Sequence, residues 1–389
     1  MKQMLKGKVI ALLSLAFLLI MAGCGKENVA SGEKGESSQD DVIKMGLLLA
    51  ETGPASTLGA SQVKTVKLLQ KQLDEAGPIN GKTIKLIQYD YETDDTKAVV
   101  AMDKLLSEGV VAINAATQSS TTMAVMPKAI EAKIPFLAGA PIDVENEYVY
   151  STVHSPRVIA MPIVDYLNKH GIKKVAWLNA ADGFGVTGLP AFKELAKENG
   201  IEIVAHEEFD ATATDMTIQL TKVRSKDPEA IIVWSRTPGA GIIARNFKAL
   251  GFDIPMIQST AAANEGFLEQ VKDDNENIFV VGSKLSVLDQ LPDSEQKELL
   301  KEFKEAYEQE FGEEPDLFAA HVVDGVYAFV EAVKAGNTTA DEIHQYLAND
   351  LGAFLGVTGT YNFSESRISL EPDGISVLAI ENNTWKYIE

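Results

Sequence analysis

Short apolar runs alternate with helical patterns along almost all of this chain, and this alternation is the feature that most restricts its fold. An apolar run at 42–50 precedes apolar residues at helical spacing over 58–77, and a run at 82–92 precedes a helical pattern over 95–109. Strands that are apolar on both faces and alternate with helices are typical of a parallel sheet covered by helices. The sequence therefore predicts an α/β fold built from repeated strand–helix units.

The alternation of apolar runs and helical patterns starts a second time near residue 173 and continues towards the carboxyl terminus. Nearly 350 of the 389 residues follow the polar segment that ends near residue 40. A length of this order favours two domains over one. We therefore expect two lobes of similar size, each a parallel sheet flanked by helices. In such folds ligands bind where strand carboxyl ends meet helix amino ends, which predicts a ligand cleft between the lobes.

The amino terminus has the marks of an export signal. Three lysines precede thirteen apolar or small residues that end at Met21. Such a stretch is too short to cross a bilayer comfortably, so residues 1–23 are predicted to be a signal peptide. Cys24 is the chain's sole cysteine and stands where a bacterial lipobox has its lipidated residue, although Met21 replaces the usual Leu. Lipidation at Cys24 is expected; an ordinary signal with an unmodified thiol is the alternative. The polar residues 24–40 are expected to be a flexible tether.

The chain is acidic, with a formal charge of −21 that includes three lysines of the signal segment. A polyanion without a basic cluster is repelled by nucleic acid and by anionic lipid headgroups. We therefore expect no nucleic-acid partner. The five histidines are scattered and show no paired spacing typical of a metal site, and no G-x-S-x-G motif is present. The sequence favours a binding protein over an enzyme.

One motif invites a different interpretation. Residues 183–188 read G-x-G-x-x-G between an apolar run and a helical pattern, which is the order of a dinucleotide-binding turn. However, three residues separate the apolar run from the first glycine, and an exported protein rarely meets NAD. No cofactor is therefore expected. The motif is interpreted as a loop at the cleft edge whose glycines permit tight backbone geometry, with Phe184 directed towards a ligand.

Six segments in succession resemble the substrate-binding proteins of branched-chain amino-acid ABC importers. They are IKMGLLLAETGPASTLG, PINGKTIKLIQYDYETDDTKAVVAMDKLL, GVVAINAATQSSTTMAVMPKAIEAKIPFL, KKVAWLNAADGFGVTG, EAIIVWSRTPGAGIIARNFKALGFDIPMI and AAHVVDGVYAFVEAVKAG. The resemblance implies a type I periplasmic-binding-protein fold, with lobe 1 at 41–159 plus 284–360 and lobe 2 at 160–283 plus 361–389. It also implies a monomer outside the cytoplasm that closes on its ligand and delivers it to an ABC permease. Ligand sensing for a membrane receptor is an alternative.

The resemblance also indicates a binding site. Ser119 matches the family position that takes the ligand carboxylate. The amides and hydroxyls near Ser119 and Ser120 start a helix, where an anion is stabilised. Ala140 matches a position that binds through its backbone. Side chains expected to wall the pocket are those of Leu58, Phe184, His321 and Trp234.

Three positions depart from the family pattern. Ile142 and Thr260 stand where an amino-acid binder has the Thr and Glu that hold the ligand's ammonium group, and Arg236 replaces a Tyr. A buried ammonium without a carboxylate partner costs several kcal/mol. An Arg facing a cleft suits a carboxylate, unless it pairs with an acid such as Asp182. We therefore expect an aromatic or other organic acid as ligand, also because the tail GAFLGVTGTYNFSESR resembles the aromatic-carboxylate branch; a hydrophobic amino acid is the alternative.

Overall fold

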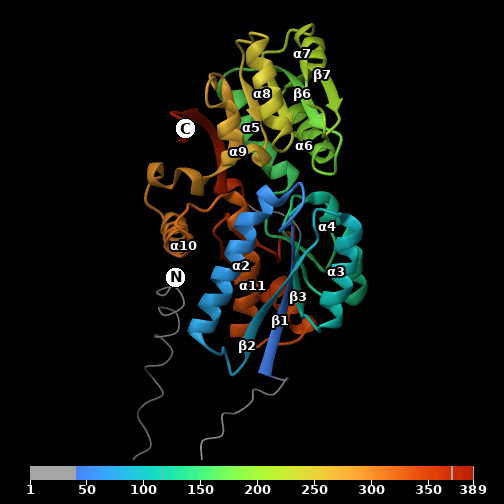
Figure 1. The fold of residues 1–389 in the computed structure, drawn as a ribbon, viewed down its shortest axis with the longest axis vertical. Helices are drawn as coiled ribbons and strands as arrows, with labels where there is room; N and C mark the ends of the chain where they lie inside the picture. The colour runs from blue at the N-terminus through green and yellow to red at the C-terminus, as the bar shows by residue number, and fades with distance from the viewer. Residues whose placement is uncertain (1–40, 116, 369–370, 389) are drawn as a thin grey trace, which may run out of the picture.

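The protein consists of two lobes, each built on its own sheet (Figure 1). The computed structural model describes residues 41–115, 117–368 and 371–388; the predicted signal peptide, tether and Cys24 lie outside these ranges. None of the helices in these ranges combines the length and the hydropathy that crossing a membrane requires. Within the same ranges, no three His, Cys, Asp or Glu side chains gather as metal ligands do.

Lobe 1 contains a five-stranded sheet of order β2-β1-β3-β4-β5, and all its neighbouring strands pair in parallel. Helices α2, α11 and α12 cover one face, and α3 and α4 cover the other. The bounds are β1 Val42–Leu49, α2 Ser56–Ala76, β2 Thr83–Asp90, α3 Asp95–Ser107, β3 Ala112–Ala115, α4 Ser119–Ala132, β4 Phe136–Ala138, β5 Val149–Ser151, α11 Leu317–Lys334 and α12 Ala340–Gln345.

Lobe 2 contains a seven-stranded sheet of order β14-β13-β10-β9-β8-β6-β7, in which only β13 and β14 run antiparallel to their neighbours. Helices α5 and α6 cover one face, and α7, α8 and α9 the other. The bounds are α5 Pro156–Lys169, β6 Lys174–Ala180, α6 Gly185–Glu198, β7 Glu202–Phe209, α7 Thr217–Arg224, β8 Ala230–Trp234, α8 Gly239–Ala249, β9 Met256–Gln258, α9 Glu265–Val271, β10 Ile278–Ser283, β13 Ile375–Glu381 and β14 Thr384–Tyr387.

The described chain passes between the lobes after β5, after β10 and between β12 and β13. The second passage leads through a 3-10 segment, η3 Lys284–Gln290, to α10 Glu295–Phe311, which packs beside α2 and α11 (Figure 1). Helix α11 is buried around most of its circumference because it lies between the lobe 1 sheet and this η3–α10 segment. A hairpin of β11 Ala353–Leu355 and β12 Thr360–Asn362 precedes the third passage.

Two of the expected lobe boundaries differ from the packing by a few residues. Val158 and Ile159, expected in lobe 1, lie in the core of lobe 2 because α5 already packs on that sheet. Tyr361 and Phe363, expected in lobe 2, lie in the core of lobe 1. The hydroxyl of Tyr361 explains the second difference, since it donates a 2.6 Å hydrogen bond to Asp324 of α11.

Candidate ligand-binding cleft

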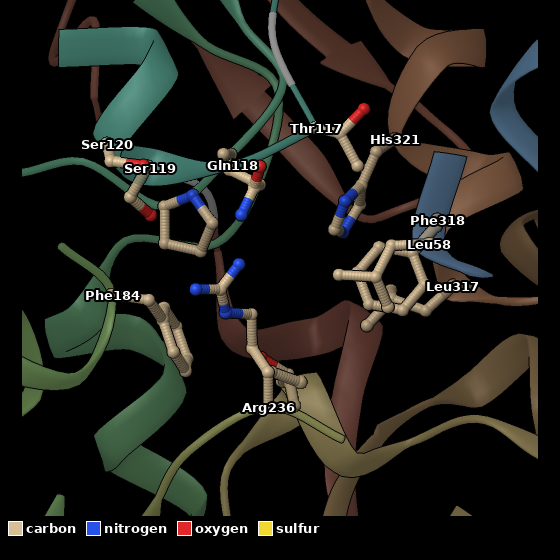
Figure 2. Close-up of a pocket in the computed structure, with 14 residues that line it drawn as sticks. Leu58, Thr117, Gln118, Ser119, Ser120, Phe184, Arg236, Leu317, Phe318 and His321 are labelled. Carbon is tan, nitrogen blue, oxygen red and sulfur yellow. The ribbon is translucent and has the colours of Figure 1, made fainter. Parts of the chain in front are cut away.

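A cavity lies between the lobes at the carboxyl ends of strands from both sheets (Figure 2). About 450 Å³ of atom-free space lies within it, a figure that includes open solvent at its mouth. In Figure 2, Ser119 and Ser120 lie at one end on the same side as Phe184. Leu58, Leu317 and Phe318 lie at the other end, next to His321. Among the described residues, the lining consists of Leu58, Thr117, Gln118, Ser119, Ser120, Ala140, Pro141, Phe184, Arg236, Thr260, Ala261, Leu317, Phe318 and His321.

The amino end of α4 supplies the polar wall from lobe 1. The helix starts at Ser119, directly after the loop that follows β3, and its N-cap Gln118 makes no side-chain capping bond. Amides in the first turn of a helix have no acceptor within the helix and carry partial positive charge. The Ser119 hydroxyl is buried and has no hydrogen-bond partner among the described residues. This end of the cavity therefore offers unused donors to an anion.

Arg236 supplies the facing wall from lobe 2, two residues after β8. Its Nη2 donates a 2.7 Å hydrogen bond to Asp182 Oδ2, and both side chains are mostly buried, with 24% and 18% exposure. The other carboxylate oxygen of Asp182 accepts from the amides of Phe184 at 3.0 Å and Gly185 at 2.8 Å. Figure 2 shows the guanidinium directed into the cavity. Arg236 therefore lines the cavity and also pairs with Asp182. The two roles that the sequence suggested for it as alternatives are both present.

A row of three aromatic rings positions Phe184. Its ring stacks on Trp234 with centroids 5.5 Å apart, and Trp234 stacks on Trp177 at 5.4 Å. Gly188 lies over Trp234 so closely that a Cβ there would come within 2.3 Å of the indole. The core of lobe 2 therefore holds the Phe184 ring in one orientation at the cavity wall.

The opposite end of the cavity is apolar and belongs to lobe 1. Leu58 comes from α2, and Leu317 and Phe318 form the first turn of α11. His321 lies one turn further and meets the Phe318 ring edge-on at 5.7 Å. Burial, with a smaller contribution from the nearby His154, lowers the pKa of His321 to about 3. The imidazole is therefore neutral at physiological pH and adds no charge to this wall.

The described cavity lining contains one cation and no Asp or Glu. The acid next to it in the sequence is Asp316, immediately before Leu317. Its Oδ1 caps α11 by accepting from the amide of Ala319 at 2.9 Å and from the hydroxyl of Ser61 at 2.6 Å. Burial raises the pKa of this carboxyl group. Asp316 is thus engaged in holding the helix start rather than facing the cavity.

Eight of the ten residues expected at the site line this cavity, and two do not. Ile142 is 1% exposed and packs in the lobe 1 core between the sheet and α3–α4. Trp234 is fully buried behind Phe184, so its expected role as a wall is wrong and it acts only through the Phe184 ring. The other eight are Leu58, Ser119, Ser120, Ala140, Phe184, Arg236, Thr260 and His321.

Sequence reasoning missed six lining residues: Thr117, Gln118, Pro141, Ala261, Leu317 and Phe318. Each of the first four is within two positions of an expected residue. Their place in loops that follow strand ends could therefore have indicated them. Leu317 and Phe318 follow Asp316, whose N-cap role places the first turn of α11 at the cleft.

Comparison with known proteins agrees with this architecture. Residues 42–371 match the model of a family described as periplasmic binding protein. The chain belongs to this family. It is 20% identical over 342 residues to the leucine-, isoleucine-, valine-, threonine- and alanine-binding protein of Pseudomonas aeruginosa, covering 86% of this chain and 89% of that protein.

Solved structures show the same fold. The branched-chain amino acid transporter substrate binding protein LivJ of Streptococcus pneumoniae, solved in complex with isoleucine, has a TM-score of 0.77 and 26% identity, covering 89% of this chain and 98% of that one. An extracellular ligand-binding receptor of Rhodopseudomonas palustris has a TM-score of 0.80 at 24% identity, over 89% and 99% of the two chains.

The expected family and the two-lobed α/β fold are confirmed by these matches. The protein is a type I periplasmic ligand-binding protein of the branched-chain amino-acid transporter type, and its family implies a location outside the cytoplasm.

Proposed function

We propose that this family member is the substrate-binding component of an ABC importer and that its ligand is a small carboxylate without an α-amino group, with an aromatic acid favoured. One observation carries the proposal: the described cavity lining combines a helix amino end and an arginine with no acidic side chain. Such a lining stabilises the negative charge of a carboxylate, whereas it contains no anionic side chain that could pair with an ammonium group.

The polar end suits a carboxylate in two ways. The unpartnered Ser119 hydroxyl and the first-turn amides of α4 are donors without a buried acceptor, and an anion at a helix amino end is stabilised by both the dipole and these donors. Arg236 faces this wall from the other lobe and has a guanidinium edge beyond the one that binds Asp182. Lobe closure would bring the two sets of donors onto one ligand.

An α-amino acid fits this lining less well. The positions that resemble the family's ammonium ligands hold Ile142, which is in the core, and Thr260, which lines the cavity without a charge. Leaving a buried ammonium without a carboxylate costs several kcal/mol. Removing the amino group from the ligand removes this cost.

An aromatic ligand is supported by the apolar end and by the Phe184 ring. Phe184 is preoriented by Trp234, and offset ring stacking contributes about 0.5–1.5 kcal/mol beyond area burial. We further propose that Cys24 carries the lipid anchor, that the protein acts as a monomer without a cofactor, and that the closed form delivers its ligand to the membrane permease.

The test is thermal melting of the purified protein with matched pairs that differ only at the α-carbon: phenylalanine with phenylpyruvate, and leucine with 4-methyl-2-oxopentanoate. Benzoate, 4-hydroxybenzoate and benzoylformate extend the acid series. A ligand at a hundred times its Kd adds about 2.7 kcal/mol, which raises the Tm by a few degrees. We expect stabilisation by the oxo acids and none by their amino acids. Stabilisation by the amino acid alone in each pair would refute the proposed ligand class.

The second candidate is a hydrophobic amino acid, because the relatives named above include a protein described as binding leucine, isoleucine, valine, threonine and alanine and one solved with isoleucine. In that case the ammonium group would have to find its acceptors among carbonyl and hydroxyl oxygens such as that of Thr260. The same matched pairs distinguish the two candidates.

A further inference from the structure

The loop from Ala181 to Phe184 of lobe 2 approaches the amino end of α4 in lobe 1 most closely where Gly183 lies against Ser120. A Cβ placed on Gly183 would lie 3.0 Å from the Cβ of Ser120, and 3.1 Å from both its Cα and its amide nitrogen. Carbon atoms in folded proteins rarely approach each other so closely. The two lobes therefore touch here only because residue 183 has no side chain.

The backbone itself does not demand glycine at this position. Gly183 is absent from the residues with positive φ, so an L-residue could adopt its conformation. The other two glycines of the motif have a different reason: a Cβ on Gly185 would come within 1.9 Å of the Ala180 carbonyl oxygen, and one on Gly188 would overlap Trp234. Those two glycines serve the packing of lobe 2, whereas Gly183 serves a contact between lobes.

Neither side of this contact can yield by a local movement. The loop is held by Asp182, which binds the amides of Phe184 and Gly185 through one oxygen and Arg236 through the other. The amide of Ala181 also donates to the carbonyl oxygen of Phe209 at 2.7 Å. On the other side, the atoms that the added Cβ would meet belong mainly to the helix backbone of Ser120.

The helix start is fixed as well. The hydroxyl of Thr121 donates a 2.6 Å hydrogen bond to Asp95 at the beginning of α3, which ties the two helices together. A side chain on residue 183 would therefore be accommodated by moving whole lobes apart rather than by bending one segment. Because the same helix start holds Ser119 and Ser120, such an opening would withdraw Arg236 from the polar end of the cavity.

We propose that Gly183 is the residue that permits full closure of the lobes, and that it controls ligand affinity without touching the ligand. It is not among the residues that line the cavity, so it acts as a positioning residue through the contact with Ser120. This inference rests on the proposed closure of the lobes around a ligand, but it does not depend on which ligand is bound.

The first experiment needs no ligand. Cys24 is the chain's sole cysteine, so a C24S background allows S120C and G183C to be introduced together. Disulfides require Cβ atoms about 3.5–4.5 Å apart. A small separation of the lobes, of the kind that a side chain at residue 183 imposes, brings the two Cβ atoms from 3.0 Å into this range. An oxidant traps even a minor closed population, so we expect an intramolecular disulfide, detected by mass spectrometry of the monomer. Failure to form it, both alone and with phenylpyruvate or leucine present, would overturn the proposed contact.

The second experiment measures affinity by calorimetry with phenylpyruvate and with leucine. The G183V variant should weaken binding of whichever probe the wild type binds by roughly tenfold to a hundredfold, because only a fraction of the molecules closes. G183A should have a smaller effect. The control is A181V, which places the same valine side chain at an exposed position of the same loop and should leave Kd unchanged.

The ligand-free melting temperatures of G183V and the wild type should agree, which distinguishes a closure defect from misfolding. Wild-type affinity in G183V would refute the role of Gly183. If neither probe binds the wild type, phenylpyruvate and leucine are both excluded as ligands, while the disulfide experiment still decides whether residues 120 and 183 meet.

Discussion

His154 should make the protein less stable as the pH falls. It lies on the passage from β5 to α5, is 2% exposed, and its Nε2 has no hydrogen-bond partner among the described residues. Burial lowers its pKa from 6.5 to about 3, opposed weakly by a backbone hydrogen bond involving Thr358. Between these two pKa values the unfolded chain binds a proton that the folded protein excludes. The contribution of neutral His154 to the free energy of unfolding is therefore fully present above about pH 6.5 and is lost as the pH falls towards 3.

The size of the effect follows from the two pKa values. At about pH 5 the unfolded imidazole is protonated roughly 1.5 pH units below its pKa, while the buried imidazole is still neutral. Each pH unit corresponds to about 1.4 kcal/mol, so His154 alone should remove about 2 kcal/mol of the free energy of unfolding between pH 7.5 and pH 5. Asp316 and Asp324, whose pKa values burial raises, act in the opposite direction.

A comparison of variants isolates the histidine from those acids. Urea denaturation of the wild type and of H154Q is measured at pH 7.5 and pH 5, and the loss of stability between the two pH values is compared. The wild type should lose about 2 kcal/mol more than H154Q, whatever the substitution costs at neutral pH. Equal losses in the two proteins would show that His154 is protonated in the folded state and would refute the reasoning from burial.

Four further substitutions have expected outcomes. S119L should abolish binding in calorimetry while leaving the ligand-free Tm nearly unchanged, because the added side chain fills the polar end of the cavity; retained binding would contradict the site. R236Q should weaken binding of an acid ligand by roughly tenfold to a hundredfold, whereas D182N should alter the salt dependence of that binding because Arg236 loses its internal counter-ion. G188A should lower the Tm by several degrees, since its Cβ would overlap Trp234.

The sequence predicted secondary structure well where caps are visible. The helix expected over 95–109 is α3 Asp95–Ser107, and Asp94 caps its first turn by accepting from the amide of Lys97 at 2.9 Å. By contrast, residues 353–362 form the hairpin of β11 and β12, which has no such cap in the sequence. Its turn closes with a 2.9 Å bond from the amide of Gly356 to the carbonyl oxygen of Gly359, whose φ of 145° a residue with a side chain rarely adopts. Apolar content alone did not reveal this turn.

A site residue was predictable where the strand and helix next to it in the sequence place it at the cleft. Ser119 follows a buried strand and opens a helix, so its position at the cleft could be read locally. Trp234 could not be placed in this way, because whether it faces the ligand depends on Phe184, fifty residues earlier, covering it. The contact of Gly183 with Ser120 is hidden for the same reason, since it exists only between two lobes.

The ion pair between Arg236 and Asp182 limits what the arginine alone can decide about the ligand. Because a carboxylate already lies 2.7 Å from the guanidinium, the pair brings almost no net charge to the cavity. The positive potential that favours an anion must then come from the amino end of α4. The lining also lacks a carboxylate at position 260, where Thr260 stands. A zwitterionic amino acid would gain the same contacts for its carboxylate and would still bury its ammonium unpaired. The preference for an acid therefore depends on what lobe 1 donates and on what the lining lacks, more than on Arg236.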